Sequence, residues 1–554
     1  MRLVEGFLLL LAAVFFALHY RHLAADFPNY SPWMDWSKYT DEGWYGDAAI
    51  RHYQLGHWYV RGDFNPAAAL PVWPFLEAIL FHFSGVSLVA ARALSVSVFG
   101  AILILSWLLL RRWRPHREPA LSPSLAVFML ALNPFCFVFT RLAILEPLLI
   151  LLTLVALLAA GSIQYRDPAS AQLPGSKSAL ARYARALAPN TLPILALGIL
   201  IPLMIFTKTT AVFLLPAVFW IVFAVLGYRL KSLLAIGAPI ALLAATLWLL
   251  WYGLVVYPHY LLDYRYLFSA NGYTGISRTN AVSVLEATVK DGMWMGSLLF
   301  PAALAALVCA LASFRRLRNY PLVVALILWA GGYVGFLAYH DNLQPRYYLV
   351  IAVPLTLLFA EVMELFLDGR LVIAPRTSFS HGALVAVAAL LVLAIALPDA
   401  IQTLHYVRHP EYTLLRAATQ LDDYIAQDRK HDPKHSQLVL SISGSDLSLM
   451  TGLHSINDDF GTMELADRAA LYRPGWYVAW NEIDDDKMDA LTRNFRIERV
   501  AEFPAMDDPD RDLLILYRLD DQAGEPPRGH RRQAIPQSLQ TRIGQQPSET
   551  QLVH

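Results

Sequence analysis

The sequence predicts a mainly α-helical, polytopic membrane protein with about eleven transmembrane helices, followed by a small α/β domain. Two observations support this prediction. Of the 554 residues, 56% are hydrophobic and 16% are charged, whereas average soluble domains carry about 25% charged residues. Long apolar runs also recur along the chain as far as residue 400. We therefore expect most of the chain to lie in a bilayer.

Each expected span is an apolar run of about 20 residues, the length that crosses a bilayer. The runs are 3–19, 86–110, 121–139, 143–161, 190–207, 209–227, 232–252, 296–313, 320–339, 345–367 and 382–400. The run 71–84 is shorter and contains Pro71, Pro74 and Glu77, so we expect it to lie at the interface or to re-enter the membrane. The first run is interpreted as a retained span, and a cleaved signal peptide is the alternative.

Basic clusters predict the orientation, because cytoplasmic loops are enriched in Lys and Arg. If the N-terminus is cytoplasmic, the clusters at 111–118, 177–185, 228–231, 315–318 and 369–376 all fall on the cytoplasmic side. The periplasmic side then receives the loop 20–85, the turns at Arg141 and Lys208, the loop 253–295, the turn 340–348 and the chain after 400. We expect a multi-pass inner (plasma) membrane protein with a periplasmic C-terminal domain.

Three parts are predicted: a transmembrane catalytic domain over 1–400, an α/β domain over 401–519 and a disordered tail over 520–554. The α/β prediction comes from a helical stretch at 411–429 and from strand-like segments at 437–443, 476–480, 495–503 and 512–519. The tail is polar and rich in Pro, Gln and Arg, and it has too few apolar side chains to fold.

Acidic side chains near the outer membrane edge are the candidate catalytic residues. Asp41 and Glu42 open an aromatic, amphipathic stretch of the kind that lies at the headgroup level. A carboxylate there can take a proton from an acceptor hydroxyl while a lipid co-substrate stays in the bilayer; the alternative is a solvated loop or an acidic helix start. Glu146, near the outer end of a span, is the second candidate, and a plain ion pair with Arg141 is the alternative for it.

Four cations on the outer side suggest a phosphate site, because the positive-inside rule depletes Lys and Arg there. They are Arg92, Arg141, Lys208 and Arg346. Arg and Lys at helix ends can hold a phosphate group; the alternative is that each one snorkels to the interface. A sugar linked through phosphate to an isoprenoid chain would use the apolar spans, the cations and a carboxylate base together.

Other function classes find little support. The sequence lacks the phosphate-binding and zinc-hydrolase motifs G-x-x-x-x-G-K-[ST], G-x-G-x-x-G after a strand, and H-E-x-x-H. Lys and Arg total 44, as do Asp and Glu, so net charge indicates no nucleic-acid partner. We expect no cofactor and no metal, although the outer-loop residues His259 and His340 leave a divalent metal open.

The order and spacing of several motifs resemble the GT-C membrane glycosyltransferases, in particular bacterial relatives of protein O-mannosyltransferases and of the aminoarabinose transferase that modifies lipid A. The motifs are "TDEGWYGDAAIR" (40–51), "PVWPFLEAILFHFSG" (71–85), "AARALS" (90–95), "RLAILEPLL" (141–149), "TKTTAVFLLPA" (207–217) and "PRYYLVIAVPL" (345–355). The resemblance covers the first 365 residues. It implies a polyprenyl-phosphate sugar donor, transfer with inversion on the periplasmic side, and a glycan, lipid or protein acceptor.

The resemblance also implies roles for single residues. Asp41 would be the catalytic base, with Glu42 and Glu146 as further acidic residues of the site, and Arg92, Lys208 and Arg346 would serve the donor phosphate. Glu146 stands where these relatives usually have Asp, and Ala stands where the aminoarabinose transferase has a lysine before its Pro-Pro pair. Lipid A and aminoarabinose are therefore not implied. The competing predictions are a polytopic transporter or lipid flippase and an assembly factor that works through its C-terminal domain.

Overall fold

The structure is a computed structural model. It describes residues 2–113, 120–164, 187–270, 275–290, 292–340, 343–371, 380–506, 508 and 511–522. The predicted disorder of the tail after 522 and the basic cluster at 177–185 lie outside these ranges.

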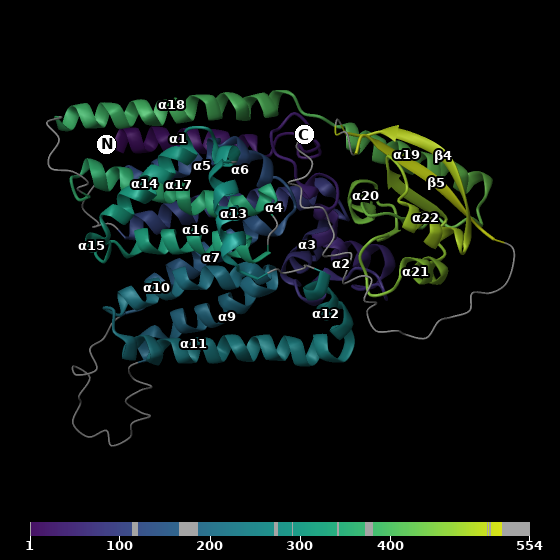
Figure 1. The fold of residues 1–554 in the computed structure, drawn as a ribbon, viewed down its shortest axis with the longest axis horizontal. Coiled ribbons are helices and arrows are strands. Elements are labelled where there is room, and N and C mark those ends of the chain that lie inside the picture. Colours follow the sequence, from purple (N-terminus) through teal and green to yellow (C-terminus); the bar gives the residue numbers. More distant parts are fainter. Residues whose placement is uncertain are drawn as a thin grey trace, which may run out of the picture.

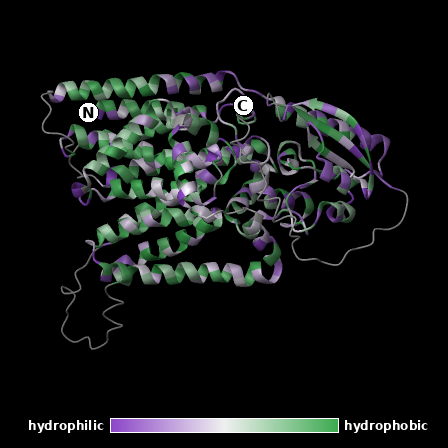
Figure 2. Cartoon of the chain, in the orientation of Figure 1, coloured by the Kyte–Doolittle hydropathy of each residue, from purple (hydrophilic) through white to green (hydrophobic). Residues whose placement is uncertain are grey.

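A bundle of apolar helices forms one end of the molecule and a small α/β domain forms the other (Figure 1). The bundle helices are α1 (Arg2–Leu18), α4 (Leu88–Arg112), α5 (Ser122–Leu132), α6 (Pro134–Phe139), α7 (Leu145–Gly161), α9 (Thr191–Thr207), α10 (Leu215–Val225), α11 (Leu230–Trp251), α14 (Leu299–Ala312), α16 (Pro321–His340), α17 (Pro345–Leu367) and α18 (His381–Arg408). Figure 2 shows hydrophobic colouring over most of the bundle and more hydrophilic colouring in the C-terminal domain.

Within the described ranges, six helical stretches are long and apolar enough to cross a membrane: Leu88–Arg112, Ala188–Thr207, Leu230–Ser269, Pro321–His340, Pro345–Leu367 and His381–His431. The predicted number of about eleven spans is therefore not confirmed. One reason is local: the run 121–139 folds as two short helices, because Asn133 leaves the helical conformation and accepts a hydrogen bond from the Cys136 N–H at the start of α6. The prediction of a mainly helical chain with a small C-terminal sheet is confirmed.

The bundle is built around α17. In the most apolar 18-residue stretch of this helix, 89% of the residues are buried, and the helix packs against α5, α14 and α16. In contrast, only 17% of the most apolar stretch is buried in the segments Leu230–Ser269, which begins with α11, and His381–His431, which begins with α18. The helices α11 and α18 lie along opposite edges of the bundle (Figure 1). Their exposed apolar side chains are suited to contact with lipid.

Two helices of the loop 20–85 lie between the bundle and the C-terminal domain (Figure 1). They are α2 (Asp41–Leu55) and α3 (Val72–Ser84), and they pack against each other. The predicted position of this stretch at the headgroup level stays a prediction, but the first residues of α2 are buried within the protein. Trp44 donates a hydrogen bond of 3.0 Å to the Ile442 carbonyl and packs edge-on against Phe460 at 4.9 Å. The outer helix is therefore part of a domain interface.

The C-terminal domain is a five-stranded mixed sheet with strand order β2-β1-β3-β5-β4. Its strands are β1 (Val439–Leu440), β2 (Ser455–Ile456), β3 (Trp476–Trp480), β4 (Phe495–Pro504) and β5 (Leu513–Asp521), and its helices are α19 (Thr413–His431), α20 (Gly444–Thr451), α21 (Leu465–Tyr472) and α22 (Asp485–Thr492). The strands β1, β2 and β3 run parallel, while β5 pairs antiparallel with β3 and β4. The two-residue strand β2 was not predicted, because it has no alternating pattern.

A buried charge network holds this domain on the outer loop. Asp63 lies between two guanidinium groups, with Arg51 at 2.5 Å and Arg468 at 3.0 Å, and all three side chains are at most 3% exposed. Arg51 also pairs with Asp47 at 2.8 Å. Asp47 in turn accepts a hydrogen bond of 2.6 Å from the Ser445 hydroxyl of α20. Because removing one member of a buried ion pair is strongly destabilising, the network fixes the domain's position relative to α2.

Gly43→Ala is expected to loosen this interface. A Cβ at Gly43 would lie 2.2 Å from the backbone nitrogen of Asp446, so α2 and α20 would have to separate, at a cost of about 3 kcal/mol. Thermal unfolding and limited proteolysis of the purified protein measure the effect. The matched control is Gly237→Ala in α11, where a Cβ meets no atom within 4 Å. Equal stability of the two variants would contradict the contact.

Candidate active site

The predicted acids and cations gather at the end of the bundle that faces the C-terminal domain. Asp41 is the first residue of α2, Glu146 and Arg346 lie in the first turns of α7 and α17, and Lys208 follows the last residue of α9. The basic cluster at Arg111–Arg112 lies at the opposite end of α4 from Arg92. Because consecutive long helices run in alternating directions, the ends of helices far apart in sequence meet in one charged site.

Arg346 lies at the centre of this site between two carboxylates. Its Nη1 lies 2.5 Å from Asp35 Oδ1, and its Nη2 lies 2.9 Å from Asp41 Oδ2. The Arg346 backbone N–H also donates a hydrogen bond of 2.8 Å to Asp35 Oδ2. All three side chains are at most 7% exposed, so these contacts are shielded from water and stronger than surface ion pairs.

A second ion pair joins Lys208 to Glu146. The aromatic ring of Tyr347 connects the two pairs, because the Lys208 ammonium lies 4.3 Å and the Arg346 guanidinium 4.8 Å from its centroid. Cations are attracted to the face of an aromatic ring at such distances. The ring therefore holds two like-charged groups near each other, an arrangement that suits a ligand with several negative oxygens.

Glu42 and Arg92 form a separate pair that fixes the outer loop. The Arg92 Nε and Nη2 donate to the two Glu42 carboxylate oxygens at 2.8 and 2.5 Å. Arg92 also donates to the carbonyls of Leu23 and Ala25, and Glu42 accepts a hydrogen bond of 2.8 Å from the Ala143 N–H. These bonds use four of the five N–H donors of the guanidinium. Glu42 and Arg92 thus hold the outer loop in place next to Asp41.

Arg141 lies apart from Glu146, so the alternative ion pair between them is not formed. Its Nη2 donates hydrogen bonds of 2.6 Å to the carbonyls of Arg21 and His22, and its guanidinium lies 4.6 Å from the Phe137 ring centroid. Burial, followed by the nearby Arg92, lowers the pKa of Arg141 to about 9. Its contacts secure the start of the outer loop, and its predicted role at a donor phosphate stays a prediction.

Two residues of the site were not predicted from the sequence. Asp35 is the N-cap of the short 3-10 helix Trp36–Lys38 that precedes Asp41, and nothing in its local sequence distinguishes it from a loop carboxylate. Tyr347 follows Arg346 directly, and its contact with Lys208 joins residues far apart in sequence. A search for acids in the same loop as Asp41 would have found Asp35. No sequence signal marks the ring contact.

The environment of Asp41 favours proton transfer. Burial raises the pKa of the Asp41 carboxyl above its ordinary value of 3.8, and the neighbouring Asp35 and Glu146 carboxylates add to that rise, while Arg346 opposes it. Asp41 accepts a hydrogen bond of 3.1 Å from the Thr40 hydroxyl. A carboxylate with a raised pKa is a stronger base than one in water. Among the residues that the structure describes, no three His, Cys, Asp or Glu side chains are grouped to hold a metal ion.

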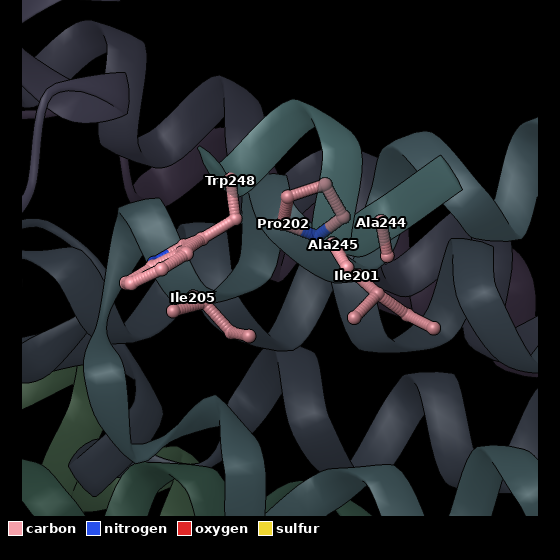
Figure 3. Close-up of a pocket in the computed structure, with 6 residues that line it drawn as sticks. All are labelled: Ile201, Pro202, Ile205, Ala244, Ala245 and Trp248. Carbon is pink, nitrogen blue, oxygen red and sulfur yellow. The ribbon is translucent and has the colours of Figure 1, made fainter. Parts of the chain in front are cut away.

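An apolar pocket lies between α9 and α11 (Figure 3). It has a volume of about 230 Å³ and is lined by Ile201, Pro202, Ile205, Ala244, Ala245 and Trp248. Ile205 precedes Lys208 by three residues, roughly 4.5 Å along a helix axis. The lining is apolar, so the pocket offers hydrophobic contacts.

The fold is that of known membrane enzymes. ArnT from Cupriavidus metallidurans, solved with undecaprenyl phosphate bound, superposes with a TM-score of 0.58 at 16% identity, over 92% of this chain and 98% of ArnT. The archaeal oligosaccharyltransferase AglB from Archaeoglobus fulgidus, solved with an inhibitory peptide and a dolichol-phosphate, gives a TM-score of 0.51 at 15% identity, over 95% of this chain and 75% of AglB. No family model and no curated protein matches the sequence. The predicted resemblance to the GT-C glycosyltransferases is confirmed for the fold.

Proposed function

We propose that this protein is an integral membrane glycosyltransferase that moves a hexosyl or pentosyl unit from a polyprenyl-phosphate donor to an acceptor hydroxyl on the periplasmic face, with inversion. One observation carries the proposal: the carboxylate of Asp41 and the cations Arg346 and Lys208 converge at one end of the bundle, within a shared network of ion pairs and ring contacts. A base beside two cations matches the needs of this reaction.

In the proposed reaction, Asp41 takes the proton of the acceptor hydroxyl as its oxygen attacks the anomeric carbon of the sugar. The bond between that carbon and the phosphate oxygen breaks, and the polyprenyl phosphate leaves with the electron pair. Arg346 and Lys208 stabilise the negative charge that develops on the phosphate. Attack from the side opposite to the leaving group inverts the anomeric configuration.

The surroundings of the site support a lipid-linked donor. Lys208 ends α9, and the pocket of Figure 3 begins about one turn earlier on the same helix. A phosphate held by Lys208 can therefore continue into an apolar chain along α9 and α11. The lipid phosphates named in the two superposed structures, undecaprenyl phosphate and dolichol-phosphate, are ligands of this kind. The positive-inside rule supports a periplasmic position, because the described basic residues Arg111, Arg112 and Arg370 lie at the opposite ends of α4 and α17 from Arg92 and Arg346.

The experiment that tests this function is mass spectrometry of envelope glycolipids and glycans from cells with and without the gene. We expect one glycosyl unit to be missing from an acceptor and the lipid-linked donor to accumulate when the gene is absent. Unchanged glycans together with a changed transmembrane distribution of the donor would instead identify a transporter. The gene carrying Asp41→Asn, expressed at the same level, provides the matched control and should not restore the glycan.

Transfer is expected to rise with pH through the pKa of Asp41. The carboxylate accepts a proton only when it is ionised, and burial raises its pKa above the ordinary value. The acidic limb of kcat/KM should therefore lie above the ordinary pKa of 3.8. Replacing Arg346 with Gln removes the positive charge that opposes the rise, so the acidic limb should move to higher pH. A rate independent of pH across the whole acidic range would contradict the assignment of Asp41 as the base.

A further inference from the structure

Three carboxylates and two cations share the centre of the candidate active site. Asp35 and Asp41 contact Arg346, and Glu146 contacts Lys208. The carboxylates outnumber the cations, so the site carries no surplus positive charge that would attract a phosphate. If the proposed function holds, a donor phosphate that binds the Nη groups of Arg346 must compete with a carboxylate, because Asp35 and Asp41 occupy Nη1 and Nη2.

The two carboxylates on Arg346 are held very differently. Asp35 accepts three hydrogen bonds, from the Ser37 N–H at 2.8 Å, the Arg346 N–H at 2.8 Å and Arg346 Nη1 at 2.5 Å. Two of these donors are backbone groups, so Asp35 is tied to the start of α17 itself. Asp41 has one contact with Arg346, through Nη2 at 2.9 Å, and one with the adjacent Thr40 hydroxyl. Exchanging Asp41 for another anion would therefore break fewer hydrogen bonds than exchanging Asp35.

Lys208 does not offer the same exchange. Its only carboxylate contact in the described part of the chain is Glu146, whose side chain is completely buried. Replacing that contact would leave Glu146 without its cation and without any other side-chain hydrogen bond in the described part of the chain, whereas Asp41 would keep the Thr40 hydroxyl. Arg346 can instead accept a phosphate on one side of its planar group while Asp35 keeps the other side, because a guanidinium donates in several fixed directions.

We propose that the Asp41–Arg346 ion pair is an autoinhibitory contact that the donor phosphate opens, and that Asp35 is the positioning residue that keeps Arg346 in place. This inference rests on the proposed function. In the structure Arg346 pairs with the base. A phosphate that takes the Nη2 side releases Asp41 toward the acceptor hydroxyl, and loss of the cation makes that carboxylate more basic. The protein thereby couples activation of the base to the presence of the donor.

Binding of undecaprenyl phosphate to the purified full chain in nanodiscs tests this coupling without requiring an acceptor. Asp41→Asn removes the competing charge, so we expect its Kd to fall at least about ten-fold. Asp35→Asn leaves Arg346 with Asp41 alone, so we expect its Kd to rise about ten-fold. Removal of negative charge by itself would tighten binding in both variants, and opposite signs therefore distinguish the exchange from a general electrostatic effect.

The control is Asp399→Asn, a buried carboxylate that accepts a hydrogen bond from Asn133 and contacts no cation of the site; its Kd should equal that of the wild type. Asp41→Ala provides the same comparison if Asp41→Asn does not fold. Equal signs for Asp35→Asn and Asp41→Asn, or no change in either, would overturn the autoinhibitory contact. Wild-type affinity in both Arg346→Ala and Arg346→Lys would instead overturn the phosphate site of the proposed function.

Discussion

Asp41→Asn is expected to reduce glycosyl transfer by about 10²–10⁴-fold, the usual contribution of a positioned general base. The amide keeps the shape of the carboxyl group but cannot take the proton of the acceptor hydroxyl. The free energy of unfolding should change less than the transfer rate does, because Arg346 retains Asp35 as a partner at 2.5 Å. Transfer by the purified protein and its thermal unfolding temperature, measured on the same preparation, separate the two effects.

The result to compare is Glu42→Gln, the adjacent carboxylate. Glu42 accepts hydrogen bonds from Arg92 and from the Ala143 N–H, so its loss should lower the unfolding temperature more than that of Asp41 does. If Glu42→Gln abolished transfer in a fully stable protein and Asp41→Asn did not, the base would be Glu42. The sequence places the two acids side by side, and only their partners in the fold distinguish them.

Arg346→Ala is expected to remove both donor binding and a large part of the stability. The change leaves Asp35 and Asp41 buried without their cation, a loss of about 3–5 kcal/mol for one member of a buried pair. Thermal unfolding measures this loss, and binding of undecaprenyl phosphate measures the loss of the site. Arg346→Lys should recover part of the stability but little of the binding, because an ammonium lacks the planar fork of donors.

The matched control for the stability effect is Arg473→Ala. Arg473 pairs with Asp521 at 2.8 Å, but its side chain is 44% exposed, and exposed ion pairs contribute about 0–1 kcal/mol. A loss in Arg346→Ala no greater than that in Arg473→Ala would show that the central ion pairs are hydrated and weak. The charge balance on which the autoinhibitory contact depends would then not hold.

Hydrophobicity predicted the membrane class and the helical content correctly, but it did not predict how many helices cross a membrane. The run 121–139 is uniformly apolar, yet Asn133 and Pro134 divide it into α5 and α6. A sliding count of apolar residues does not detect one capping side chain. The predicted strand segments contain β1 and β3 and overlap most of β4 and β5, whereas the two-residue strand β2 was missed because it is not part of a longer apolar segment.

The candidate site was predictable as a set of residues but not as a set of partners. Charge placement relative to the spans identified Asp41, Glu146, Lys208 and Arg346, which the structure brings together. It could not show that Glu146 pairs with Lys208 rather than with Arg141, because partners on different helices depend on packing. Asp41 was expected at the surface, and the structure corrects this: the residue is 2% exposed, and its helix α2 packs against α20 of the C-terminal domain.

The most direct measurement is the conversion of polyprenyl-phosphate sugar to free polyprenyl phosphate, followed by mass spectrometry. Purified protein is added to membranes from cells that lack the gene, which hold the donor and the acceptor together. The wild type should convert the lipid-linked sugar and release polyprenyl phosphate, whereas Asp41→Asn should leave the donor intact. Equal conversion by the two proteins, or no conversion by either, would contradict sugar transfer with Asp41 as the base.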